Sequence, residues 1–349
     1  MTTRISRRHT LASAAIAVAL TAGSTLALAG TASAHATAFS AKTLPLAAGQ
    51  YQSAYSERND ALWVTTAVGR AATSTSLLKV DPDTLTVEQT ILPPVLDATT
   101  GAREAVYGVA VDDEHNTVWV TNTRSNTVAV YSQRTGAHLA TLADVAHARE
   151  IVVDEKHDTV WASAFGAGAL VAYDSRTFTE KKRVTVEGSG PAGLAVDEKT
   201  GTVYAADLSN DRIIEVNRAS GTPRLIPTGD GPISISLSRN GRTAYTADQT
   251  AGGVSVVDLR TGTVTRSVAT GAGTLSVATD DRSGDVVVVN RTAATATVVD
   301  PRTGVVEETV ATGANPNHVE VAEGVAYVVD KSGAGAGGED QVTVIRLGH

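Results

Sequence analysis

The chain has 349 residues, a mean hydropathy of −0.01 and a formal net charge of −8. It contains no cysteine, which excludes a disulfide framework, covalent haem attachment, a lipoprotein anchor and thiol catalysis. The acidic balance gives no long-range attraction to nucleic acid, so any polyanion site would have to be a local basic patch.

The first 34 residues have the organisation of an export signal. Arg4, Arg7 and Arg8 form a basic start, an apolar run follows over Leu11–Leu28, and Ala32-Ser33-Ala34 is an A-x-A cleavage site. We therefore predict a signal peptide over residues 1–34 that is cleaved near Ala34.

The route of export has alternatives. Residues 6–11 resemble a twin-arginine signal, but Thr10 stands where that signal prefers phenylalanine, so Sec export is the alternative. An uncleaved membrane anchor is a second alternative. Cleavage would remove three arginines and leave 26 basic and 37 acidic side chains, a formal charge of −11. We expect a secreted, extracellular protein with no membrane span after signal removal.

A strand-like segment rich in Val, Tyr and Trp recurs seven times along the rest of the chain. The steps between its central residues, from Trp63 to Tyr327, are 56, 42, 43, 41, 42 and 40 residues. A period of about 40–45 residues with four short strands per unit predicts β-propeller blades. We predict one all-β domain over residues 38–347, a seven-bladed β-propeller. The seven segments are Leu62–Thr66, Val118–Asn122, Val160–Ala164, Val203–Asp207, Ala244–Asp248, Val286–Asn290 and Ala326–Asp330.

We name the four strands of a blade a to d, from the channel outward. In the second unit the expected strands are Ala105–Asp112, Thr117–Asn122, Thr127–Ser132 and Ala137–Leu142. Their runs are apolar on both faces, which suits a sheet packed between two neighbouring sheets. The carboxylates in the a–b and c–d turns are expected to bind backbone amides rather than ligands.

The last unit lacks one strand. We predict that Ala38–Ala47 supplies strand d of this blade beside Gln341–Arg346, which closes the ring and removes exposed sheet edges. Three inserts break the period and lengthen loops or links: Val68–Ser76, Leu92–Arg103 and Lys331–Asp340.

Several segments resemble the YVTN family of β-propellers, and within it the YncE-like periplasmic or secreted proteins. The family repeat, V-x-V-T-N followed by N-x-V-x-V-x-D, is matched by Val118–Asn122 with Asn126–Tyr131. The resemblance extends from about Gly49 to Leu347. It implies a seven-bladed propeller without established catalysis, and single-stranded DNA binding is associated with YncE-like proteins. Further segments that carry it are Tyr55–Trp63, Asp81–Leu85, Asn122–Asn126 and Ala148–Asp154.

The links between blades and the b–c loops of a propeller meet at one mouth of the channel, and the start of strand a lines that mouth. Six basic residues fall there in an acidic protein, so an anionic ligand could be held by arginine side chains. The alternative is that these charges pair with neighbouring blades or stay hydrated. The candidate ligand-binding residues are Arg149, Glu150, His318, Asn317, Tyr107, Arg103, Arg124 and Arg291, with Arg70, Glu104 and Lys331 on the same face.

Two metal hypotheses are weaker. His147 and His318 both belong to this mouth, whereas His115 and His157 fall on the opposite, a–b turn face. A two-histidine site at the mouth is therefore one alternative to ordinary surface histidines. Calcium or magnesium bound by mouth carbonyls and one of two aspartates, Asp207 or Asp248, is the other.

The three tryptophans occupy equivalent positions in strand b. Because Trp63, Trp119 and Trp161 recur inside apolar strands, we predict burial between blades rather than an exposed platform for stacking bases.

The packing motifs are complete, whereas no catalytic set is. The leading hypothesis is a secreted, monomeric, non-catalytic binding or scaffold protein without cofactor, which holds an extracellular ligand, peptide or protein at the channel mouth. One alternative is a metal-dependent propeller enzyme of the lactonase, lyase or quinoprotein type, which needs a convergent histidine and acid cluster. Another is single-stranded nucleic-acid binding, which the net charge disfavours and which needs arginines beside exposed aromatic rings.

Overall fold

The computed structural model describes residues 39–69, 74–219 and 221–348. The proposed signal peptide and Arg70 lie outside these ranges. The chain divides into two units, Met1–Ala36 and Thr37–His349, and the described residues belong to the second. Within them, no helix combines the length and the apolar character needed to cross a membrane.

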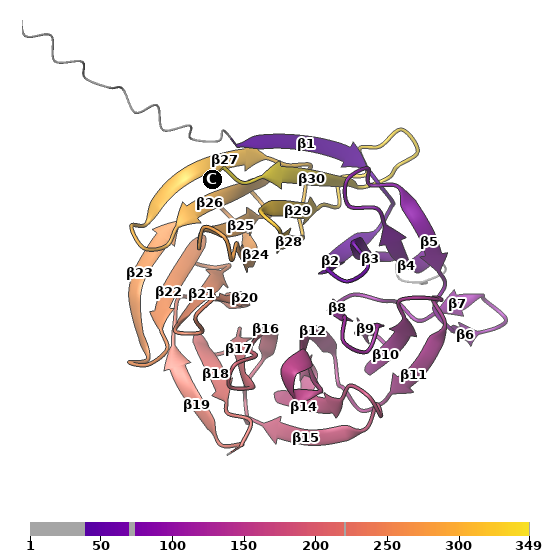
Figure 1. The fold of residues 1–349 in the computed structure, drawn as a ribbon, viewed down its shortest axis with the longest axis horizontal. Helices are drawn as coiled ribbons and strands as arrows, with labels where there is room; N and C mark the ends of the chain where they lie inside the picture. Colours follow the sequence, from indigo (N-terminus) through magenta and orange to yellow (C-terminus); the bar gives the residue numbers. More distant parts are fainter. Residues whose placement is uncertain (1–38, 70–73, 220, 349) are drawn as a thin grey trace, which may run out of the picture. The chain divides into compact units, whose positions relative to one another are not determined.

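Seven four-stranded antiparallel sheets surround a central channel, with strand a of each sheet innermost (Figure 1). The all-β, seven-bladed propeller is confirmed. Blade 1 is β2 (Gln50–Ser56), β3 (Ala61–Val68), β4 (Ser74–Val80) and β5 (Val87–Ile91); blade 2 is β8 (Val109–Asp112), β9 (Thr117–Asn122), β10 (Thr127–Ser132) and β11 (His138–Leu142). Blade 3 is β12 (Ala148–Asp154), β13 (Thr159–Ala164), β14 (Ala169–Asp174) and β15 (Glu180–Thr185).

The remaining blades repeat this order. Blade 4 is β16 (Pro191–Asp197), β17 (Thr202–Asp207), β18 (Arg212–Val216) and β19 (Pro223–Pro227); blade 5 is β20 (Pro232–Leu237), β21 (Thr243–Asp248), β22 (Gly253–Asp258) and β23 (Thr263–Ala269). Blade 6 is β24 (Thr274–Thr279), β25 (Val286–Asn290), β26 (Thr295–Asp300) and β27 (Val305–Ala311); blade 7 is β28 (His318–Ala322), β29 (Val325–Val329), β30 (Gln341–Arg346) and β1 (Ser40–Pro45).

Blade 7 is built from both ends of the described chain, as predicted. Strand β1 pairs with β30 in antiparallel register, from Ser40 opposite Arg346 to Pro45 opposite Gln341. Asp340 extends this junction, because its carboxylate accepts hydrogen bonds from the backbone N–H groups of Gly49 at 2.6 Å and of the next residue at 3.2 Å. The ring is therefore closed by strand pairing and by one buried carboxylate.

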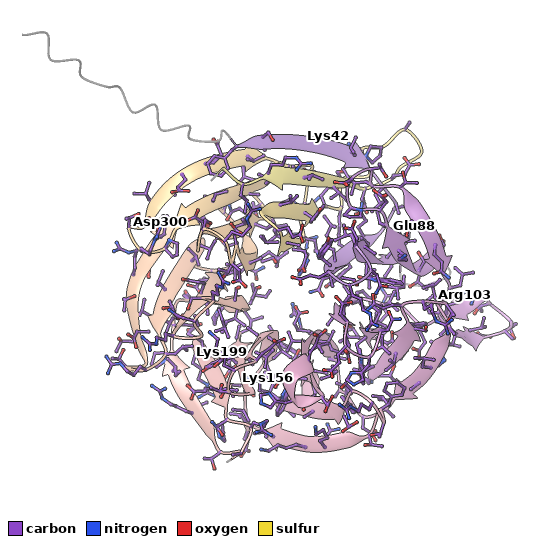
Figure 2. All side chains as sticks on the ribbon, viewed as in Figure 1. Lys42, Glu88, Arg103, Lys156, Lys199 and Asp300 are labelled. Atoms are coloured by element: carbon purple, nitrogen blue, oxygen red, sulfur yellow. The ribbon has the colours of Figure 1, made fainter. Side chains whose placement is uncertain are left out.

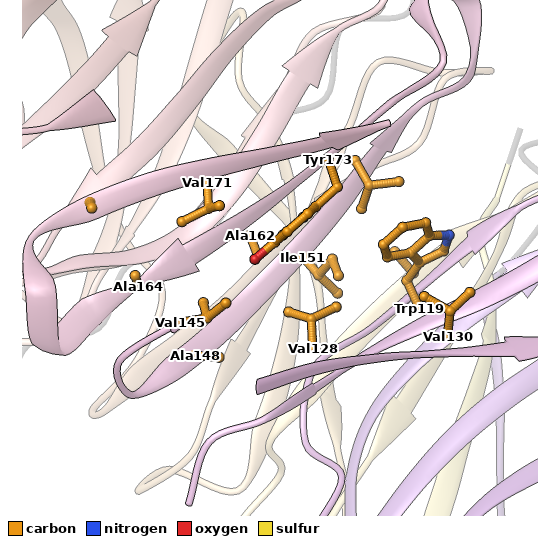
Figure 3. Packing of buried hydrophobic residues seen from close by; sticks show 13 residues of the cluster. Trp119, Val128, Val130, Val145, Ala148, Ile151, Ala162, Ala164, Val171 and Tyr173 are labelled. Carbon is orange, nitrogen blue, oxygen red and sulfur yellow. The ribbon is translucent and has the colours of Figure 1, made fainter. Parts of the chain in front are cut away.

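The core lies between the blades. Trp63 and Trp119 are fully buried and Trp161 is 2% exposed, which confirms the predicted burial. Trp119 packs between blades 2 and 3, where its ring centroid lies 6.3 Å from that of Tyr173 (Figure 3). The ring centroid of Phe178 lies 5.5 Å from that of Trp119. The tryptophans therefore join neighbouring blades and offer no platform to a ligand.

The insert after blade 1 forms a small hairpin of β6 (Val95–Asp97) and β7 (Ala102–Arg103). Figure 1 shows that this hairpin projects from the outer edge of the ring. The insert thus lengthens the link between blades 1 and 2 on the side away from the channel.

Candidate functional site at the channel mouth

A break in strand pairing near the start of strand a directs side chains toward the channel. In β12, Ala148 pairs with Ala164 and Ile151 pairs with Ala162, so Arg149 and Glu150 stand opposite a single residue. The same two-against-one arrangement places Tyr51 and Gln52 in blade 1, and single extra residues, Ile233 and Leu275, bulge in blades 5 and 6. Such bulges turn side chains out of the sheet, which explains how these positions come to line the mouth.

Blades 1, 2 and 3 stabilise their irregular strand a with a hydroxyl on strand b. Thr121 Oγ1 accepts a hydrogen bond from Gly108 N at 2.8 Å and donates to Arg149 O of the next blade at 2.9 Å. Ser163 Oγ likewise accepts a hydrogen bond from Glu150 N at 2.9 Å and donates one to Ala192 O of blade 4 at 3.0 Å. We call this arrangement, which Thr65 repeats in blade 1, the hydroxyl bridge.

Blades 5, 6 and 7 use a side chain of strand a instead. Ser234 Oγ accepts a hydrogen bond from Val277 N at 3.3 Å, and Ser276 Oγ accepts one from Val319 N at 3.2 Å. In blade 7 the acceptor is His318 Nδ1, which lies 3.3 Å from Ser53 N of blade 1. His318 therefore performs the same inter-blade role as the two serines.

This contact fixes the protonation pattern of His318. Because Nδ1 accepts a backbone N–H, the neutral ring carries its proton on Nε2 and presents a donor rather than a lone pair. Burial lowers the pKa of His318 to about 4, so the ring is neutral near pH 7. A neutral ring with Nε2–H is a poor metal ligand, which argues against the metal site proposed for His147 and His318.

The cations at the mouth lie over aromatic rings. Lys331 Nζ is 4.2 Å from the ring centroid of Tyr51, and the guanidinium of Arg149 is 5.2 Å from that of Phe165. Arg291 instead donates a hydrogen bond to Asn317 Oδ1 at 2.9 Å. In the described chain no carboxylate oxygen lies within 4.0 Å of the charged nitrogens of Arg149, Arg291 or Lys331.

A cavity of about 310 Å³ is lined by Arg149, Arg291, Asn317 and Tyr51, and Lys331 lies beside it over the ring of Tyr51. Burial, and secondarily the charge of Arg291, lowers the pKa of Lys331 to about 8, which leaves most of its charge at pH 7. The residues that line the cavity include Tyr51, Gln52, Tyr107, His147, Arg149, Glu150, Arg291, Asn317 and His318.

Two carboxyl groups lie deeper in the channel. Burial raises the pKa of Glu150 to about 7, although a hydrogen bond from Gln52 Nε2 at 2.9 Å to its Oε2 atom opposes the rise. Burial raises the pKa of Glu320 to about 7 as well, and the charge of Glu150 adds to the rise. Both carboxyls are therefore partly neutral near pH 7, which weakens the negative field below the cations at the mouth.

The contact between Gln52 and Glu150 passes over blade 2 and depends on Gly108. A Cβ at Gly108 would lie 2.5 Å from Arg149 O and 3.2 Å from Gln52 Oε1. Glycine thus leaves the room in which blade 1 contacts blade 3. Residues 52, 108 and 150 carry no shared motif, which is why sequence patterns gave no signal for this contact.

The structure does not bring every candidate residue to the cavity. Arg103 lies on β7 at the outer edge of the ring, where its Nη1 atom donates to Pro93 O at 2.7 Å (Figure 2). Glu104 is buried and accepts a hydrogen bond from Asn122 Nδ2. Arg124 stays near the mouth, with its guanidinium 5.7 Å from the ring centroid of Tyr107.

The two aspartates considered for calcium or magnesium are held by the protein itself. Asp207 accepts hydrogen bonds from Gly190 N at 2.7 Å and Arg212 Nε at 2.7 Å. Asp248 accepts one from Ser255 Oγ at 2.6 Å. The contacts of Asp207 are typical of a carboxylate that orders a turn, whereas Asp248 Oδ1 is buried without a hydrogen-bond partner among the described residues.

No family model matches the chain. A segment of 241 residues is 27% identical to the proteins described as YncE in Salmonella typhi and Salmonella typhimurium. The match covers 63% of this chain and spans 65% of the length of each of these relatives.

Solved structures resemble the fold over most of the chain. A virginiamycin B lyase from Staphylococcus aureus superposes with a TM-score of 0.72 at 13% identity, covering 89% of this chain and all of the lyase chain. The hydrazine synthase of Kuenenia stuttgartiensis superposes with a TM-score of 0.70 at 15% identity, covering 86% and 96%. At these identities the likeness concerns the fold alone. The chain is a seven-bladed β-propeller and a distant homologue of the YncE proteins.

Proposed function

We propose that this protein is an exported, monomeric, non-catalytic binding propeller that holds an anionic ligand, or an anionic group of a peptide or protein, at the channel mouth. The observation that carries the proposal is that Arg149 and Arg291 line one cavity, with Lys331 beside it over the ring of Tyr51, and that none of the three has a carboxylate partner among the described residues. Arginine offers paired donors that fit carboxylate or phosphate oxygens. A polar cavity of about 310 Å³ suits a small anion or a terminal group better than a large apolar ligand.

The enzyme alternative finds less support in the geometry. The virginiamycin B lyase shares the fold, but fold alone does not carry an activity. In the described residues, the channel does not gather three histidine or acid ligands within metal-binding distance, and His318 is committed to Ser53. Binding therefore remains the better-supported proposal.

Single-stranded nucleic acid is an outcome that the test must distinguish. Tyr51, Tyr107 and Phe165 are half-buried at the mouth beside basic residues, which favours this alternative. Against it, the cations already cover a face of each ring, and the tryptophans are buried. Bases would have to displace those cations before stacking.

Three probes test the proposal: citrate, inorganic phosphate and an oligothymidylate, each titrated at low salt by calorimetry. We expect citrate or phosphate to bind, and Arg149→Ala and Arg291→Ala each to weaken binding about tenfold or more, as loss of a charge-assisted contact does. Arg282→Ala is the matched control, because Arg282 lies at the opposite end of the channel and donates to Glu323 O at 2.6 Å.

Three results would overturn the proposal. They are preferential binding of the oligothymidylate, an affinity for citrate and phosphate in both mouth variants equal to that of the parent, and a loss confined to Arg282→Ala. Native mass spectrometry of protein purified from culture supernatant would identify the natural ligand and test export.

A further inference from the structure

Three potential metal ligands converge on the face opposite the mouth, at the junction of blades 2 and 3. Glu114 and His115 belong to the a–b turn of blade 2, and Asp158 belongs to that of blade 3. One ligand atom from each lies within 4.8 Å of the others, and His115 Nε2 is 3.3 Å from Asp158 Oδ1. Among the described residues, no other histidine and acid group of this size meets that spacing.

The imidazole of His115 is oriented by a carboxylate outside this group. Asp112 is fully buried, and its two oxygens lie 3.1 and 2.9 Å from His115 Nδ1. A carboxylate at Nδ1 keeps the proton there and leaves the lone pair of Nε2 available, as in metal sites whose histidines are held by a second carboxylate. His115 thus has the opposite tautomer from His318.

A cationic side chain already occupies the space between the three ligands. Arg176 Nε donates to His115 Nε2 at 3.1 Å, which shows the lone pair acting as an acceptor. Its Nη2 atom lies 2.9 Å from Asp158 Oδ1 and 4.0 Å from Glu114 Oε1. The Arg176 side chain is 58% exposed, so it can move into solvent when another cation takes its place.

The neighbouring blade shows what packing alone requires. In blade 3, His157 Nδ1 lies 2.9 Å from both oxygens of the buried Asp154, so the histidine–aspartate pair is a repeated structural feature. The two carboxylates beside Nε2 are not repeated. Where the first junction has Glu114 and Asp158, the aligned turns of the next junction have Lys156 and Gly201.

We propose that Glu114, His115 and Asp158 bind a divalent transition metal, Zn²⁺ or Cu²⁺, with Asp112 orienting the imidazole and Arg176 displaced into solvent. One nitrogen and two carboxylate oxygens suit these ions, whereas calcium and magnesium prefer oxygen ligands alone. This site is separate from the channel mouth and does not depend on the proposed function.

Titration calorimetry with zinc chloride alone tests the site. We expect one Zn²⁺ per chain, and His115→Gln, which keeps a donor for Asp112, to weaken binding at least about tenfold. Asp112→Asn should weaken it by roughly 10–100-fold through loss of the orienting carboxylate. Arg176→Ala should strengthen it about tenfold, because a competing positive charge is removed.

The second blade junction supplies the control. His157→Gln should leave zinc affinity unchanged, and all variants should melt cooperatively in the presence of a chelator. With Cu²⁺, electron paramagnetic resonance should show coupling to one imidazole nitrogen that His115→Gln abolishes. Zinc binding that is unchanged in His115→Gln, or absent from both the parent and Arg176→Ala, would overturn the proposal.

Discussion

Blades 1–3 and blades 5–7 solve the same packing problem with different side chains. In blades 1–3 a hydroxyl on strand b joins one strand a to the next, and a tryptophan fills the core between blades. In blades 5–7 the equivalent strand-b positions are Ala247, Val289 and Val329, and the acceptor comes from strand a. The same bulged geometry can therefore be satisfied from either strand.

Blade 4 marks the change between the two solutions. Among the described residues, blade 4 has neither the hydroxyl on strand b nor the side-chain acceptor on strand a. Gly193 instead lets the backbones of blades 4 and 5 approach closely, because a Cβ there would lie 2.6 Å from Ser234 Cα. The comparison also shows that an unusual residue need not be functional. His318 departs from the serines of blades 5 and 6, yet it accepts the same kind of backbone hydrogen bond.

The largest effect should come from removing the strand that completes blade 7. Deletion of residues 37–48 exposes the edge of β30 and removes the backbone hydrogen bonds of Asp340 with Leu46 and Ala47, so we expect the melting temperature to fall by about 10 °C or more. Hydrogen exchange should lose protection first in blade 7. An unchanged melting temperature would contradict this account of ring closure.

Trp119→Ala tests the tryptophan packing of blades 1–3. The side chain is fully buried, so we expect a loss of roughly 3–5 kcal/mol in the free energy of unfolding, measured by denaturant titration. Val287→Ala is the matched change in blade 6 and should cost less, because the smaller side chain leaves a smaller cavity. Equal losses of unfolding free energy in the two variants would remove this distinction between blades 1–3 and blades 5–7.

The hydroxyl bridge can be tested against its counterpart. Thr121→Val leaves Gly108 N and Arg149 O without their partner, for which we expect a cost of about 1–3 kcal/mol. Ser276→Ala leaves only Val319 N without its acceptor and should lower the free energy of unfolding by about 1 kcal/mol. If Ser276→Ala proved the more harmful change in urea unfolding, the two devices would not be equivalent.

A further effect on stability depends on pH. The folded state raises the pKa of Glu150, so it binds more protons than the unfolded state between the usual carboxyl pKa and about 7. Stability associated with this group is therefore present at low pH and is lost as pH rises through 7. Glu150→Gln should gain on the order of 1–3 kcal/mol over the parent at pH 8.

That gain should shrink as pH falls toward 4.5. His318 contributes with the opposite sign, because its lowered pKa makes the unfolded state the better proton acceptor below about 6.5. Unfolding titrations of the parent and Glu150→Gln from pH 4.5 to 8 check the prediction. A constant difference between the two proteins would show that Glu150 does not titrate in this range.

Sequence periodicity was sufficient for the blades and for the closing strand. The strand-b segments recur at nearly constant spacing, and two of the four strands expected in blade 2 have the predicted bounds. Strand a there begins at Val109 rather than Ala105, because Gly108 N donates its hydrogen bond to the Thr121 hydroxyl rather than to a backbone carbonyl of strand b. The hydroxyl recurs at the equivalent positions of blades 1 and 3 as Thr65 and Ser163, but the repeat alone does not show that it bonds to the start of strand a.

The candidate site was only partly predictable, for a related reason. Arg149, Arg291 and Asn317 were placed at the mouth by the repeat, and the structure brings them to one cavity. Arg103 belongs to the insert Leu92–Arg103. The sequence shows that this insert lengthens the link between blades 1 and 2, but not in which direction the link projects. The hydrogen bond of Gln52 to Glu150 joins residues 98 positions apart, so it depends on the curvature of the assembled ring.

Because β1 pairs with β30, the ring can close only after both of these strands have been synthesised. The hydroxyls of Thr43 and Thr343, 300 positions apart, lie 3.0 Å from each other. A growing chain can stack its inner blades in order, but blade 7 cannot form until the last strand has been made. Until then the molecule is an open arc with unpaired edges, which proteases and chaperones can recognise. Closure thus separates finished molecules from truncated ones without any additional signal.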